Sequence, residues 1–182
     1  MANLKPIRAM GVDPSTKSTG VVILDSNGTK SPNVPFQACF KHPDERGMRR
    51  YRELATKVMQ TYYHFKPDIL VIEGYSLNMK HSSSVVPLVE LGAVIRFLLN
   101  LDGIQWFDPR ATEVKQFVTG KGNSPKDKMM MFVLKNWSFE SENNDIADAY
   151  ACAIMGLAIR NRVPSLTQGQ RAVAGKLAIR SF

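Results

Sequence analysis

The stretch from Gly11 to Gly20 most constrains how this chain can fold. It starts at the end of an apolar run, reaches a lone carboxylate at Asp13, turns through a corner rich in Pro, Ser and Thr, and leads into a second apolar run, Val21 to Leu24. An acid at the tip of a buried strand costs free energy unless a basic group or a metal ion pairs with it. Asp is also common in turns, because its carboxylate accepts hydrogen bonds from nearby backbone N–H groups. On this stretch alone, a ligand and a turn residue are both open interpretations.

The composition indicates one globular domain with a positively charged surface. Hydrophobic residues make up 44% of the 182 positions, and no apolar run approaches the roughly 20 residues of a membrane-spanning helix. The net charge of +8 favours a polyanionic partner such as nucleic acid. The first residues lack the plan of a signal peptide, and Cys39 and Cys152 lie far apart in apolar surroundings. We therefore expect a cytoplasmic protein, either a cellular one that acts at the nucleoid or a virus-encoded one that acts inside the host cell.

Five segments have the pattern of β-strands. The first three are joined by short polar connections, one of them containing Asn27-Gly28, and such connections predict an antiparallel meander. The fourth is apolar on both faces, which is typical of a central strand covered on both sides. The expected strands are Ile7–Asp13, Gly20–Leu24, Val34–Phe40, Ile69–Ile72 and Gln105–Phe107.

Apolar residues recur at three- and four-residue steps in the rest of the chain, which is the period of a helix. Helices are expected at residues 47–65, 82–100, 108–118, 124–135 and 144–160, the third with Asp108 as its N-cap. The second is apolar nearly all round, so we expect it to be covered on more than one side, by this domain alone or partly by a second subunit. The period fades after Pro164. We expect one domain over residues 1–164 and a basic tail over 165–182, with at most a weak helix at 173–179, that is mobile or helps to hold DNA.

Four acids fall at the ends of these elements. Asp13 and Glu73 each end a buried strand, and Asp145 and Asp148 lie three residues apart on one face of the last helix. The helix dipole favours acids in the first turn, which accounts for Asp145 better than for Asp148. If the first and fourth strands are neighbours, the four carboxylates meet at one edge of the core, and their mutual repulsion implies divalent cations. Oxygen ligands without His or Cys select Mg²⁺ or Mn²⁺, and two such ions can activate a water and stabilise the leaving oxygen of a phosphoryl displacement.

The order of these motifs resembles that of the RNase H-like fold and, within it, the RuvC family of Holliday junction resolvases. Residues 11–20 are similar to the family's opening Gly-Ile-Asp-Pro-Gly-x-x-x-Thr-Gly, and residues 71–73 resemble its second-acid strand. Residues 114–122 with Lys126 resemble its Val-Lys-x-x-Val-x-Gly-x-Gly-x-x-x-Lys run, and residues 145–149 its closing Asp-x-x-Asp-Ala. The matches fall in family order from about residue 7 to residue 160. The sequence departs from the pattern at Ser15, where the family usually has Gly, and at Tyr75, one position before the family's aromatic residue.

This resemblance implies a mixed five-stranded sheet, the meander plus two parallel strands, flanked by helices. It implies an endonuclease that makes paired nicks in four-way DNA junctions, with a two-fold homodimer, joined through the helix at 85–99, supplying two sites. It implies two Mg²⁺ ions per site, replaceable by Mn²⁺, with Asp13 bridging them and Lys115 and Lys126 holding the scissile strand or stabilising developing charge. The implied metal ligands, which are also catalytic, are Asp13, Glu73, Asp145 and Asp148. Further expected DNA contacts are Lys17, Tyr75, Lys80, Lys121 and Lys128.

Three other interpretations stay open. A nuclease of the same fold that cuts branched DNA more broadly, or RNA/DNA hybrids, would carry the same acids. A non-catalytic junction-binding protein would be expected to have a broken acid set, whereas all four acids are present here. Actin-like sugar kinases and ATPases open with a similar Gly-x-Asp loop, but they need two such domains, more than 182 residues can hold.

Overall fold

Four strands form one mixed sheet at the centre of the protein, in the order β3–β2–β1–β4. The structure, a computed structural model, describes residues 5–75 and 82–180, apart from the side chains of residues 82–84 and 126. β1 pairs antiparallel with β2, and β2 antiparallel with β3, which confirms the expected meander. β4 pairs parallel with β1, with Val12 opposite Ile72. The strands are β1 (Ile7–Asp13), β2 (Thr19–Ser26), β3 (Asn33–Phe40) and β4 (Ile69–Ile72).

The expected fifth strand, Gln105–Phe107, is wrong as a strand. Phe107 makes a single parallel bridge with Val71, through hydrogen bonds from Phe107 N to Leu70 O (2.9 Å) and from Ile72 N to Phe107 O (2.8 Å). Beyond this bridge Pro109 has no N–H to donate, so the next rung keeps only the bond from Gly74 N to Pro109 O. The segment therefore touches the free side of β4 without extending the described sheet.

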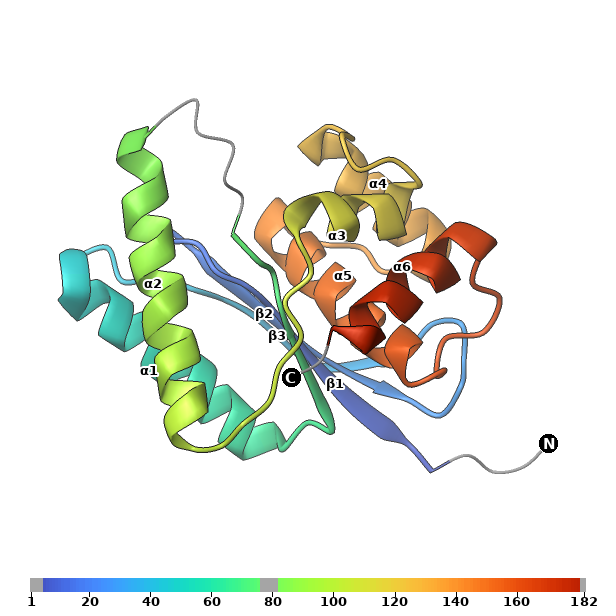
Figure 1. Cartoon of the computed structure of the whole chain (residues 1–182), viewed down its shortest axis with the longest axis horizontal. Coiled ribbons are helices and arrows are strands. Elements are labelled where there is room, and N and C mark those ends of the chain that lie inside the picture. The colour runs from blue at the N-terminus through green and yellow to red at the C-terminus, as the bar shows by residue number, and fades with distance from the viewer. Residues whose placement is uncertain (1–4, 76–81, 181–182) are drawn as a thin grey trace.

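Helices cover both faces of the sheet (Figure 1). α1 and α2 lie on one face, and α3 to α6 on the other, with α5 directly against β1 and β2. These six helices are α1 (Gly47–Phe65), α2 (Ser82–Leu101), α3 (Ala111–Thr119), α4 (Lys126–Trp137), α5 (Asn144–Ile159) and α6 (Gln168–Ile179). No helix within the described residues has the length and apolar character needed to cross a membrane.

Two helices differ from their expected form. α3 begins after Arg110 rather than at Asp108, because the preceding segment is engaged with the end of β4, where Pro109 O accepts a hydrogen bond from Gly74 N (2.7 Å). α6 is longer than the weak helix expected at 173–179, and its buried residues Val173, Ala174 and Leu177 pack in the same core as α3 and α5. Its capping box joins Thr167 and Gln170 in both directions, which favours a regular helix. The separation of residues 165–182 as a basic tail stays a prediction.

The two faces of the sheet are packed differently. Strand residues alternate between them, so that Ala9 contributes to the core beside α5 and Met10 to the core beside α1 and α2. The contact between α5 and the sheet is built mainly from small residues. A Cβ atom added to Gly11 would lie 2.0 Å from Ala149 O, and one added to Gly20 would lie 2.2 Å from Asp145 O. These two glycines therefore let the backbone of α5 rest directly on the backbone of β1 and β2, which sets the position of its first two turns.

Candidate active site

A cavity of about 250 Å³ opens where β1 and β4 end. It brings together six of the residues that the sequence predicts as catalytic or DNA-binding, and all six are partly exposed. They come from both strands, the segment after β4, α3 and α5. The six are Asp13, Glu73, Tyr75, Lys115, Asp145 and Asp148. The rest of the lining is Pro14, Ser15, Gly74, Leu88, Arg96 and Ala111.

The parallel pairing of β1 and β4 accounts for the nearness of the first two acids. Val12 and Ile72 are opposite each other, so the next residues, Asp13 and Glu73, leave adjacent strands at the same edge. Glu73 N continues the ladder by donating to Val12 O at 2.9 Å. A carboxylate therefore follows each of two neighbouring strands at the place where the sheet opens to solvent.

The close contact of α5 with the sheet brings the other two acids to this edge. Asn143 caps the helix, its Oδ1 accepting a hydrogen bond from Ile146 N (3.0 Å), and so fixes where the helix starts. Asp145 follows in the first turn, beside Gly20, and Asp148 lies one turn further along. The buried Cys152 lies close to these acids. Burial raises the pKa of its thiol well above the ordinary value, and the negative charges of Glu73, Asp13 and Asp148 raise it further.

The corner between β1 and β2 is closed by Thr19. The hydroxyl of Thr19 donates to Ser15 O (2.9 Å) and lies 3.4 Å from Ser15 N as an acceptor. Among the described non-glycine residues, positive φ angles occur at Lys66, Ser138, Asn161 and Ser165, so Ser15 has an ordinary backbone conformation. The position does not require the conformational freedom of the glycine that the resembled motif has there.

The donor set suits a hard divalent cation. Four carboxylates line the cavity and neither His nor Cys does, so the available ligands are oxygens of the kind that Mg²⁺ and Mn²⁺ prefer. In the part of the chain that the structure describes, no three His, Cys, Asp or Glu side chains are already grouped as ligands of one ion. The carboxylates therefore share a cavity without forming a finished ligand cage.

The predicted basic residues are spread more widely. Lys115 lines the cavity from α3. Lys17, Lys121 and Lys128 are exposed and are not part of the lining. Lys126 is the first residue of α4, and its side chain lies outside the described atoms. Lys80 lies outside the described residues altogether.

Arg96 is the charged lining residue that the sequence reasoning missed. It comes from α2, and its guanidinium Cζ lies 4.7 Å from the centre of the Tyr75 ring. Its Nη2 donates to Glu73 O at 3.3 Å. The available signal was a single arginine in the apolar run from Val94 to Leu99, where a charge needs partners.

A protein-family model described as "Crossover junction endodeoxyribonuclease RuvC" matches residues 9–156. A protein of that name from Hydrogenovibrio crunogenus is 28% identical over 155 residues, covering 85% of this chain and 88% of the relative. One from Carboxydothermus hydrogenoformans is 29% identical over 154 residues, covering 82% and 95%.

Two solved structures share the fold. The RuvC structure from Thermus thermophilus has a TM-score of 0.69 at 17% identity and covers 81% of this chain and 92% of its own. The same protein in complex with Holliday junction substrate has a TM-score of 0.67 at 15% identity. The architecture of this chain is thus the RNase H-like fold that the motifs predict, with four described strands in place of five.

Proposed function

Because this chain belongs to the crossover junction endodeoxyribonuclease RuvC family, we infer that it is a Holliday junction resolvase, a metal-dependent endonuclease that cuts four-way DNA junctions. The observation that carries the inference is the cavity at the ends of β1 and β4, where four carboxylates from three elements lie beside Lys115. A phosphodiester is itself an anion, so such a cluster of carboxylates suits it only with cations bound.

Asp13, Glu73, Asp145 and Asp148 would hold two Mg²⁺ ions, for which Mn²⁺ could substitute. When bound, the ions would supply an activated water and stabilisation of the leaving oxygen. Asp13 is suited to contact both ions, because β1 lies next to β4 in the sheet and directly beneath α5. Since the described side chains do not yet form a three-ligand group, we expect the carboxylates to rearrange when cations bind.

Basic and aromatic residues around the cavity would hold the DNA. Lys115, which lines the cavity, would stabilise negative charge that develops on the scissile phosphate, and Lys126 is proposed for the same task. Tyr75 offers a ring on which an unpaired base at the branch point can stack. Phosphate contacts are proposed for Lys17, Lys80, Lys121 and Lys128.

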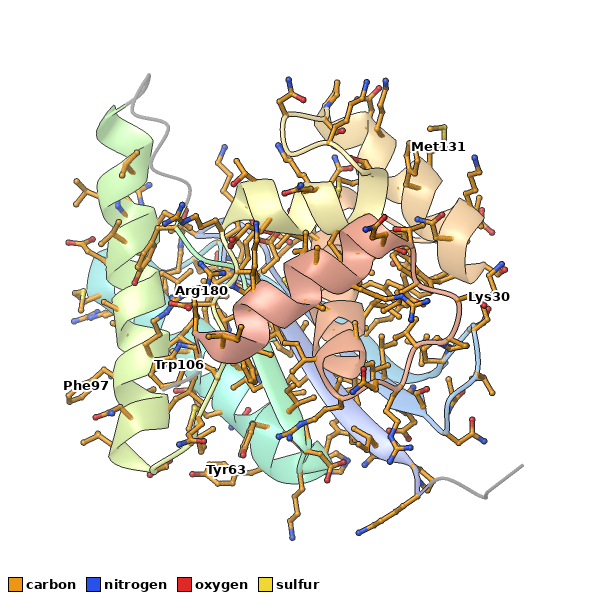
Figure 2. The ribbon with its side chains drawn as sticks, turned by 45° about the vertical axis from the view of Figure 1, so that its right-hand side comes forward. Lys30, Tyr63, Phe97, Trp106, Met131 and Arg180 are labelled. Carbon is orange, nitrogen blue, oxygen red and sulfur yellow. The ribbon has the colours of Figure 1, made fainter. Side chains whose placement is uncertain are left out.

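A homodimer would place two such sites on one junction. α2 has an exposed stripe in which Val86, Phe97 and Leu101 are 60%, 61% and 64% exposed. Phe97 points away from the rest of the molecule (Figure 2). The opposite side of the same helix, with Leu91, Ile95 and Leu99, is buried in the core. A two-fold contact along the exposed stripe would cover these side chains and give the paired nicks that resolution requires.

A panel of DNA substrates tests this function. With Mg²⁺, the protein should nick a synthetic four-way junction faster than a flap or an RNA/DNA hybrid, and Asp13→Asn should lower the rate by about a thousandfold or more because it removes a central ligand. Isothermal titration of Mn²⁺ into both proteins gives a readout besides cleavage, and the substitution should weaken binding. Preference for flap or hybrid would favour the broader nuclease, and wild-type-like cleavage by the variant would exclude the proposed site. Junction binding without cleavage or Mn²⁺ uptake would favour the non-catalytic alternative.

A further inference from the structure

We propose that Arg96 is a positioning residue that holds Tyr75 and the backbone of Glu73 in place, so that α2 fixes the outer wall of the active site. The proposal rests on the junction cleavage proposed above, since Glu73 and Tyr75 have their roles there. It concerns a residue outside the matched motifs, on the helix that also bears the exposed apolar stripe.

Three contacts fix the guanidinium of Arg96. Nη1 donates to Gly92 O at 3.2 Å, and Nη2 donates to Glu73 O at 3.3 Å. The plane of the group is also next to the ring of Tyr75, with 4.7 Å between Cζ and the ring centre, which is within range of a cation–π interaction. The side chain therefore joins two turns of α2 to Glu73, the residue after β4, and to Tyr75, two positions further along.

Gly92 makes this packing possible. A Cβ atom at position 92 would lie 2.5 Å from Tyr75 Cε1 and 2.9 Å from Arg96 Nη1, closer than real Cβ contacts allow. The hydroxyl of Tyr75 also reaches Val89 O, at 3.5 Å. The tyrosine thus rests on the backbone of α2, with the arginine beside it, at the wall of the cavity.

The peptides on either side of Glu73 are held from three directions. Glu73 N donates to Val12 O in β1, Gly74 N donates to Pro109 O before α3, and Arg96 donates to Glu73 O from α2. The first bond continues the ladder between β1 and β4, and the second lies just beyond the bridge between Val71 and Phe107. Arg96 supplies the third, and without it the carbonyl of Glu73 loses its tie to α2. The direction in which the Glu73 carboxylate leaves the backbone depends on this peptide.

A lysine cannot replace this arrangement. An ammonium group has three N–H donors on one nitrogen and no planar face, so it cannot reach both carbonyls from two separate nitrogens while lying over the ring. Arg96→Lys therefore keeps the charge of the cavity and removes the geometry. A residue that only supplied positive charge to DNA would tolerate this change.

The first test compares Arg96→Lys with Arg160→Lys, a matched change at an exposed arginine at the far end of α5. We expect Arg96→Lys to lower the single-turnover rate of junction cleavage about tenfold but to raise the junction Kd in Ca²⁺ by about threefold at most, because Tyr75 keeps its ring for stacking while the reacting groups lose their alignment. Arg160→Lys should match wild type in both. A wild-type rate for Arg96→Lys, or a loss of affinity as large as the loss of rate, would overturn the proposal.

The second test asks whether Arg96 acts through Tyr75. In a Tyr75→Leu background, adding Arg96→Lys should lower the rate by no more than about threefold, because part of what Arg96 holds is already gone. Equal losses in the two backgrounds would show that the residues act independently and would contradict the proposal.

A third measurement does not depend on cleavage. In protein labelled with 3-fluorotyrosine, the ¹⁹F resonance of Tyr75 is the one that Tyr75→Phe removes. Arg96→Lys should shift or broaden it, and Arg160→Lys should not. An unchanged resonance overturns the positioning role whether or not the protein cuts junctions. A shifted resonance in a protein that cuts no junction would keep the role of Arg96 and reject the proposed function.

Discussion

The two faces of the sheet contact their helices in different ways, one through backbone atoms and the other through large side chains. On the α5 face, the backbone of the helix touches the backbone of β1 and β2 through Gly11 and Gly20, with alanines around the contact. On the other face, large side chains such as Met10, Leu54 and Ile95 fill the space between the strands and the helices. The first kind of contact fixes one distance closely, whereas the second tolerates adjustment because side chains can repack. Asp145 and Asp148 reach the other two acids through the first kind of contact, whereas the proposed dimer surface on α2 rests on the second.

Adding one methyl group to the α5 face should cause the largest loss of stability and of cleavage. Gly11→Ala should lower the free energy of unfolding by about 3 kcal/mol or more, because the new Cβ would lie 2.0 Å from Ala149 O and the helix must move. Junction cleavage should fall by about a hundredfold even where the variant is folded, since Asp145 and Asp148 move with the helix. Urea unfolding and single-turnover cleavage measure the two effects.

The matched control lies one residue away and faces the other core. Met10→Leu conserves shape closely enough that we expect a loss below about 1.5 kcal/mol and nearly full activity. Equal losses in Gly11→Ala and Met10→Leu would mean that both faces are packed alike.

A charge on the outer side of α2 should have an intermediate effect. Phe97→Glu should leave the stability of the single chain within about 0.5 kcal/mol, because the ring is 61% exposed, yet abolish dimers and with them paired nicking. Sedimentation velocity gives the mass, and a supercoiled cruciform substrate separates single from paired nicks. Met131→Glu, at a residue 54% exposed on the opposite side of the sheet, is the control and should remain dimeric. If both variants stay dimeric, α2 is not the interface.

The smallest effect is expected in the outer layer of the α5 face, where α6 is tied to α3. Glu113 accepts hydrogen bonds from Arg110 N and from Arg180 Nη2, both at 2.8 Å. Burial opposes its ionisation, but Arg180 and the Arg110 N–H outweigh burial and lower the pKa of the Glu113 carboxyl. Because the folded pKa is lowered, the stabilisation is present above the ordinary carboxyl pKa and is lost as the pH falls through the folded value.

Glu113→Gln should therefore cost about 0.5 to 1 kcal/mol near neutral pH, and the difference from wild type should shrink in acid. Urea unfolding at pH 7 and at successively lower pH values follows it, with the exposed Glu140→Gln as control. A difference that grows in acid would contradict the assigned sign.

The sequence predicts the parts of this molecule that depend on periodicity. Apolar alternation and helical period locate the four strands and five of the helices. The acids are found as a set because Asp13 and Glu73 follow buried strands and Asp145 and Asp148 begin the apolar face of a helix. Nothing in the pattern shows that the fifth strand is limited to a single bridge, since that depends on which partner the segment meets. Arg96 escaped notice for the same reason: its partners, Glu73 and Tyr75, are distant in sequence and meet it only in the folded chain.

The contact between α5 and β1 also determines when the site becomes complete as the chain folds. β1, β2 and β3 are neighbours in sequence, so the meander can form as soon as it is synthesised, and β4 can join it later. The cavity, however, receives Asp145 and Asp148 only when α5 settles on Gly11 and Gly20. A chain in which α5 has not docked therefore carries at most two of the four carboxylates in position. Docking of α5 on the sheet is therefore a condition for cutting DNA, and a molecule that has formed the sheet alone lacks half of the acids.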